Sequence, residues 1–145
     1  MPYFPQVLFY HGKRMSIHRR SLLLAIPLTG CGPGRPAPTE PPKLIHGGWI
    51  RDAMQEQEAT AAPESVRSLN PRKVWRVIYK GPQDISGIWI LYPNETVAFE
   101  AIQKINKSMA IRVFYRGAFL VVLDAAGVPQ QALGDFLVGV RKVLP

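Results

Sequence analysis

Histidine and cysteine, the side chains on which many catalytic sites depend, are scarce in this chain. Its 145 residues include one cysteine, Cys31, and three histidines, His11, His18 and His46. The stretch from residue 72 to residue 145 contains neither type, so a Ser/His/Asp or Cys/His catalytic system cannot be built from it. The sequence also has no recurring metal-ligand spacing and no phosphate-binding glycine motif. We therefore expect no catalytic residue, no metal site and no cofactor.

Carboxylates are the remaining candidates for chemistry. Glu95, Glu100, Asp124 and Asp135 lie in the same C-terminal stretch. Glu95 and Asp135 also fit the role of acids in the first turns of helices, and Glu100 fits a solvated helix face. A hydrolase that uses two of these carboxylates is thus the alternative to a protein without enzymatic activity.

Long hydrophobic runs are missing as well. The apolar run at residues 21–28 is too short to cross a membrane, because a membrane-spanning helix needs about 20 apolar residues. It follows the basic stretch MSIHRR at residues 15–20 and precedes Cys31. A basic start, a short apolar run and small residues before a cleavage point are typical of a secretory signal.

The residues at the end of this run carry a more specific pattern. Leu28-Thr29-Gly30-Cys31 resembles the lipobox of bacterial lipoproteins. The resemblance implies that Cys31 receives a diacylglyceryl group on its sulfur, that the chain is cut before Cys31, and that the lipid holds the protein on a membrane of the cell envelope. Gly32 in place of Asp favours the outer membrane, facing the periplasm. The alternative is a buried core cysteine in a soluble protein.

Composition divides the chain into four parts. Residues 1–30 form a leader whose better start is Met15, because residues 1–14 are apolar and aromatic ahead of the basic residues. The Arg pair within the leader fits an ordinary signal or, weakly, a twin-arginine export signal. Residues 31–42 are rich in Pro and Gly and predict an extended tether of about 3.1 Å per residue. Residues 43–71 are expected to be partly ordered, with Trp49 docking and with a surface helix or loose segment at 52–62.

The charge of the chain is +8, which would suit nucleic acid or an anionic membrane. Four of the basic residues precede Cys31, and the remaining chain has 14 basic and 10 acidic residues. Because half of the excess belongs to the leader, and an exported protein rarely meets nucleic acid, we expect no nucleic-acid partner.

The residue pattern at 72–145 predicts a small α+β domain. The segments at 73–79, 85–92, 110–115 and 118–124 are rich in β-branched and aromatic residues and pair as two hairpins. Helical spacing of apolar residues follows each hairpin. The expected fold is a two-layer β-β-α-β-β-α sandwich, an antiparallel sheet with the helices on one face.

The stretches WRVIYKGP, AFEAIQK and FYRGAFLVVL resemble an uncharacterised domain found in exported bacterial proteins. This resemblance covers about half of the chain; it implies a fold and carries no assigned activity.

Aromatic side chains gather on the predicted strands, and both sides of the strand at 85–92 are apolar. The second face of the sheet is therefore either ordinary core or a surface that meets the N-terminal segment, a partner or another copy. The candidate binding residues are Trp75, Trp89, Tyr92, Tyr115 and Arg116. The expected protein is a lipid-anchored envelope lipoprotein that acts as a non-catalytic binding or assembly module, by homodimerisation or by docking on an envelope protein.

Overall fold

The computed structural model describes residues 36–105 and 111–145. The elements, in chain order, are β1 (Leu44–Ile45), β2 (Trp49–Gln57), the 3₁₀ turn η2 (Ala59–Ala61), α1 (Glu64–Arg67), β3 (Lys73–Lys80), β4 (Ile85–Leu91), α2 (Glu95–Lys104), β5 (Ile111–Arg116), β6 (Phe119–Asp124) and α3 (Gln130–Val143). Within these two ranges, none of the helices has both the length and the apolar character that a membrane crossing requires.

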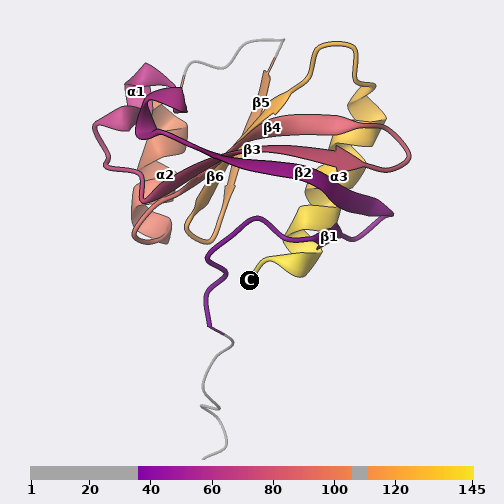
Figure 1. Cartoon of the computed structure of the whole chain (residues 1–145), viewed down its shortest axis with the longest axis horizontal. Coiled ribbons are helices and arrows are strands. Elements are labelled where there is room, and N and C mark those ends of the chain that lie inside the picture. The colour runs from indigo at the N-terminus through magenta and orange to yellow at the C-terminus, as the bar shows by residue number, and fades with distance from the viewer. Residues whose placement is uncertain (1–35, 106–110) are drawn as a thin grey trace, which may run out of the picture. The chain divides into compact units, whose positions relative to one another are not determined.

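The strands form one antiparallel sheet in the order β1-β2-β3-β4-β6-β5 (Figure 1). The α+β class and the antiparallel sheet are confirmed, but the sheet has six strands where four were expected. The two additional strands, β1 and β2, precede residue 72, so the expected boundary there is not a boundary of the sheet.

Strand β2 occupies much of the segment at 52–62, for which a surface helix or a loose segment was expected, and that expectation was wrong. The strand pairs with β3 from Ile50 opposite Lys80 to Gln57 opposite Val74, with a bulge between Arg51 and Ala53. An isolated polar helix of this length is marginal in water, whereas the edge of β3 offers a full ladder of backbone hydrogen bonds. Tertiary pairing therefore overrides the local helical preference.

The helices lie on opposite faces of the sheet, which corrects the expectation of a single helical layer. On one face, α3 packs on the aromatic side chains of β3, β4 and β6; its buried residues are Leu133, Phe136 and Val140. On the other face, η2, α1 and α2 pack on Val74, Ile90 and Leu120. The central strands are apolar on both sides, so each side needs its own cover.

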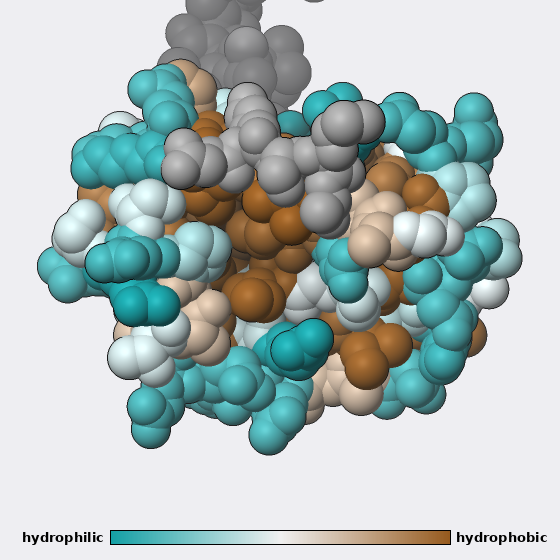
Figure 2. Space-filling model, turned by 90° about the horizontal axis from the view of Figure 1, so that it is seen from above, coloured by the Kyte–Doolittle hydropathy of each residue, from teal (hydrophilic) through white to brown (hydrophobic). Residues whose placement is uncertain are grey.

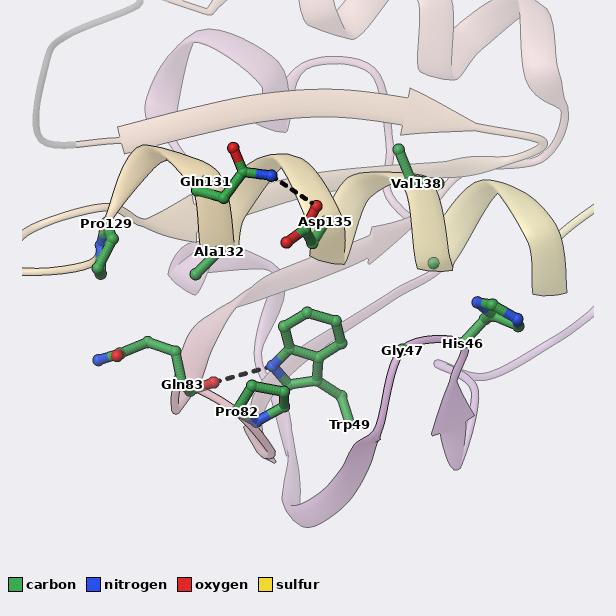
Figure 3. Close-up of a pocket in the computed structure, with 11 residues that line it drawn as sticks. His46, Gly47, Trp49, Pro82, Gln83, Pro129, Gln131, Ala132, Asp135 and Val138 are labelled. Atoms are coloured by element: carbon green, nitrogen blue, oxygen red, sulfur yellow. Dashed lines mark hydrogen bonds between the residues drawn. The ribbon is translucent and has the colours of Figure 1, made fainter.

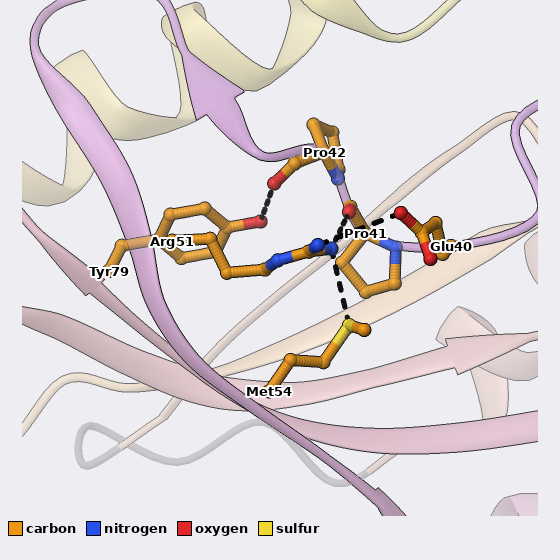
Figure 4. Close-up of polar contacts among 6 residues, drawn as sticks. All are labelled: Glu40, Pro41, Pro42, Arg51, Met54 and Tyr79. Carbon is orange, nitrogen blue, oxygen red and sulfur yellow. Dashed lines mark hydrogen bonds and ion pairs between the residues drawn. The ribbon is translucent and has the colours of Figure 1, made fainter.

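We call residues 36–42 the entry segment; its last three residues, Glu40, Pro41 and Pro42, are held on the face that α3 covers (Figure 4). Pro41 is buried, and the Tyr79 hydroxyl donates to the Pro42 carbonyl oxygen at 2.7 Å. The Arg51 guanidinium donates to the Pro41 carbonyl oxygen and forms an ion pair with Glu40 at 3.6 Å. The last residues of the expected tether therefore belong to the folded unit.

Alkaline pH is expected to destabilise the fold through its buried tyrosines. Burial raises the pKa of Tyr92 to about 12 and also raises the pKa of Tyr79, against the opposing effect of the Arg51 charge. An unfolded tyrosine ionises near pH 10, so the unfolded chain loses its protons first. The stabilisation is therefore complete below pH 10 and is lost as the pH rises from 10 toward 12. Urea denaturation across this pH range should show that the free energy of unfolding falls less steeply with pH in Tyr92→Phe than in the wild-type chain.

Tyr115→Phe, at a half-exposed tyrosine, is the control for that experiment. Equal declines in the Tyr92→Phe and Tyr115→Phe variants would contradict the role of the buried phenol.

Candidate functional site

The aromatic residues proposed from the sequence do not form a common surface. Trp75, Trp89 and Tyr92 are 3%, 0% and 1% exposed, so a partner cannot reach them in this fold. The two tryptophans pack under α3, whereas Tyr92 belongs to the core on the opposite face. The hypothesis that these three residues bind a partner does not hold, because the helices on both faces make them core.

The two remaining candidates, Tyr115 and Arg116, are partly exposed but already have partners. The Tyr115 ring meets Phe99 of α2 edge to face, with 5.5 Å between the ring centroids. The Arg116 Nε donates to the Leu144 carbonyl oxygen at 3.2 Å. Both residues therefore help to hold helices on the edge strand β5.

An apolar groove lies where the α2 side of the sheet is not covered by helix. One cross-strand row runs from β5 to β2 and contains Val113, Val122, Ile88, Arg76 and Gln55. The next row on the same face contains Ile111, Asp124, Ser86, Ile78 and Ala53. We call these two rows the sheet groove. Figure 2 shows hydrophobic side chains gathered in a hollow on this side of the unit, surrounded by hydrophilic ones.

The sheet groove has a deeper part and an extension. A hollow of about 150 Å³ lies over Gly87 and its neighbours and is lined by residues of β3, β4, β5 and β6. A second hollow, of about 490 Å³, shares Ile111 with it and reaches α1 at Pro63, Glu64 and Ser65. Apolar side chains in the floor and polar ones at the rim are the arrangement of a protein-docking surface.

Two exposed charges flank the floor of the groove. Arg76 stands on β3 and Asp124 on β6, on either side of Ile88 and Ser86 of β4. Within the described residues no ion pair engages Arg76, and Asp124 accepts a hydrogen bond from the Ala126 amide at 3.0 Å. A segment that lies across the groove thus meets a cation at one rim and an anion at the other.

A separate pocket of about 490 Å³ lies between α3 and the turns β1–β2 and β3–β4 (Figure 3). Its floor is Trp49, whose indole N–H donates to the Gln83 carbonyl oxygen at 2.8 Å. The Trp49 ring meets Phe136 edge to face, with 5.4 Å between the centroids. This confirms the expectation that Trp49 docks on the folded unit. We call this hollow the Trp49 pocket.

Polar groups line the rim of the Trp49 pocket. Figure 3 places His46 at one end, beyond Gly47, and Asp135 on α3 above the indole. The Gln131 amide donates to the Asp135 carboxylate at 3.0 Å. Among residues 36–105 and 111–145, no group of three His, Cys, Asp or Glu side chains could hold a metal ion. The Trp49 pocket therefore has an apolar wall and hydrogen-bonding groups at its rim.

The four carboxylates that a hydrolase could use each take part in local structure. Asp124 is bonded to the β6–α3 loop, Asp135 to Gln131, and Glu100 to Lys104 at 2.9 Å. Glu95 lies in the first turn of α2. Within the described residues, no hydrogen bond joins two of these four carboxylates.

The sequence signal for the sheet groove was present but incomplete. The two-sided apolar character of β4 identified a second face, and Ile88 lies on it. Strands β5 and β6 add Ile111, Val113 and Val122 to the groove. Whether these residues lie in it depends on the strand order and on how far α2 extends over the face. The Trp49 pocket was missed, because it requires β1 and β2 to join the sheet.

Close packing of α3 on the β1–β2 turn rests on a glycine. A Cβ on Gly139 would overlap the His46 carbonyl oxygen and lie 2.7 Å from the Ile45 side chain. We expect Gly139→Ala to lower the free energy of unfolding by about 1–3 kcal/mol, because overpacking outweighs the gain in helix propensity.

Gly134 on the same helix is a matched control, because a Cβ there meets nothing within 4 Å. Gly134→Ala should raise the free energy of unfolding by about 0.4–1 kcal/mol. Urea denaturation measures both variants, and equal changes would contradict the close approach of α3 to the turn.

Comparisons with known proteins add no identity to these observations. Searches against protein families, characterised proteins and solved structures give no match for this chain. The resemblances drawn from the sequence, to lipoproteins at Cys31 and to an exported domain in the C-terminal half, therefore stay predictions. The features that bear on function are the sheet groove, the Trp49 pocket and the residues that resemble a lipobox.

Proposed function

We propose that this protein is an envelope lipoprotein, anchored through Cys31, whose folded unit is a non-catalytic module that docks another envelope protein in the sheet groove. The observation that carries the proposal is the part of the α2-side face that none of the described helices covers. There, Ile78, Ile88 and Val113 remain partly exposed.

The occupant that fits this face best is an amphipathic helix of the partner. Under α1 and α2, the row of Val74, Ile90 and Leu120 is fully buried, whereas Ile88 and Val113 in the next row are only half-buried. A further helix laid beside them would complete the second layer, as helices commonly do on a sheet whose face is apolar. The apolar stripe of that helix would lie on the groove floor, with an acidic residue toward Arg76 and a basic residue toward Asp124.

The lipid anchor supports the same proposal from the sequence side. One acyl chain binds a protein to a membrane only marginally, whereas two acyl chains bind it stably. The diacylglyceryl group at Cys31 would therefore keep the module on its membrane. A module without histidine or cysteine in its C-terminal half suits recruitment better than chemistry. The proposed location is the periplasmic side of the outer membrane.

Photo-crosslinking in intact cells tests the docking site. A photoreactive amino acid at Ser86, in the groove floor, should give one discrete adduct whose mass identifies a protein other than a second copy. The same amino acid at Gln103, on the exposed side of α2, is the matched control and should give none. Arg76→Glu should weaken the Ser86 adduct several-fold, because it replaces an attractive rim charge by a repulsive one.

Arg72→Glu makes the same charge change at an exposed position outside the groove and should leave the adduct intact. Adducts of equal strength from Ser86 and Gln103, or an adduct with the mass of two copies, would overturn docking of a different protein in the groove.

Lipidation is tested by metabolic labelling with a palmitate analogue. The wild-type chain should incorporate the label and sediment with membranes. Cys31→Ser removes the only thiol in the chain and should abolish labelling and release the protein from membranes. Labelling and fractionation that do not change in Cys31→Ser would refute the anchor.

A further inference from the structure

The chain enters the folded unit beside the C-terminal end of α3. Pro36 and Pro38 line a hollow of about 220 Å³ together with Lys142, Val143, Leu144 and Pro145. Figure 1 shows the entry segment and the end of α3 at the same edge of the unit. We call these six residues the entry edge.

Few residues lie between Cys31 and the first described residue. Arg51 and Tyr79 hold Glu40, Pro41 and Pro42, and Pro36 and Pro38 line the hollow beside the end of α3, so the chain from Cys31 to Pro36 comprises only residues 31–35. Five residues span at most about 18 Å when fully extended, at about 3.6 Å each. The sequence alone predicted that the eleven residues after Cys31, residues 32–42, form a tether with a reach of roughly 35 Å.

A short tether limits where the unit can sit on a bilayer. With the acyl chains in the hydrocarbon core, the sulfur of Cys31 lies in the headgroup layer, which is about 5–7 Å deep in each leaflet. Pro36 then lies at most about 12 Å above the headgroups. A unit of about 110 residues has a radius of gyration of about 13 Å, so while Pro36 lies beside residues 142–145 the entry edge is the part of the unit nearest the lipid.

The chemistry of the entry edge suits a lipid surface. Lys142 and its neighbour Arg141 are exposed in the last turn of α3, and Val143 is 40% exposed. No acidic side chain lines the hollow. Basic residues within a Debye length of about 8 Å are attracted to anionic headgroups.

We infer that the entry edge lies against the phospholipid headgroups, with Lys142 and Arg141 facing the phosphates of anionic lipids in the anchoring leaflet. This inference rests on the proposed lipidation of Cys31. The sheet groove borders α1 and the start of β5, which Figure 1 places at the edge of the unit opposite the entry edge. The groove therefore faces away from the bilayer, and a second copy anchored in the same leaflet cannot lie face to face on it.

Depth-dependent fluorescence quenching tests this orientation in the full lipidated chain, reconstituted into vesicles of phosphatidylethanolamine and phosphatidylglycerol. The thioether at Cys31 no longer reacts with maleimide, so an introduced cysteine is the only site for a fluorophore. Lys142→Cys places the probe at the entry edge, and Ser65→Cys places it on α1 beside the groove. Lipids with a nitroxide on the headgroup should quench the probe at position 142 several-fold more than the probe at position 65.

Two further variants distinguish the effect of the tether length on quenching from the effect of the basic charge. A Gly/Ser insertion of about 20 residues before Pro36 has a root-mean-square reach of about 25 Å and should reduce quenching at position 142 toward that at position 65. Arg141→Gln should weaken quenching at position 142 in vesicles with phosphatidylglycerol and change nothing in vesicles of phosphatidylcholine alone.

Equal quenching at the two positions, in a chain whose mass confirms the lipid, would overturn the orientation and leave the anchor standing. A chain whose mass shows no lipid on Cys31 would overturn both.

Discussion

The fold depends on strands β3, β4 and β6 being apolar on both faces. Such strands are stable only where each face is covered, and one helical layer cannot cover two faces. The aromatic residues of one face pack under α3, and the aliphatic residues of the other pack under α1 and α2. Among the described residues, the α1–α2 layer is smaller than its face, so its helices do not cover part of the sheet. The sheet groove is thus a direct consequence of the core architecture, and its floor is formed by the same strands.

Trp49 links this core to the entry segment. Its indole packs on Phe136 and bonds to the β3–β4 turn, which fixes β2 at the side of β3. With β2 in place, Arg51 and Tyr79 hold the carbonyl groups of Pro41 and Pro42. Proline lacks a backbone N–H, so the carbonyl oxygens are what these residues offer for hydrogen bonding, and both are used. These bonds bind the last residues of the predicted tether to the sheet.

Several predictions from the sequence agree with the structure because they rest on short-range patterns. The β-branched and aromatic residues at 73–79 and 118–124, and the helical spacing of apolar residues after each hairpin, describe elements that form at those places. Asn94 caps α2, accepting a hydrogen bond from the Val97 amide at 3.0 Å. The expectation of a surface helix or loose segment at 52–62 was wrong because local sequence does not show the pairing edge of β3. The binding role of Trp75, Trp89 and Tyr92 failed because burial depends on how many layers cover the sheet.

The sequence by itself determined the α+β class, the positions of the central strands and of α2 and α3, and the prediction of a lipid on Cys31, since each rests on spacing along the chain. Only the tertiary structure decided the rest. It added β1 and β2, divided the helices between two faces, opened the groove beside α2 and tied the entry segment to Arg51 and Tyr79. The physical reason is that these features depend on pairing and burial between residues far apart in sequence, where backbone hydrogen bonds and apolar area outweigh local propensity.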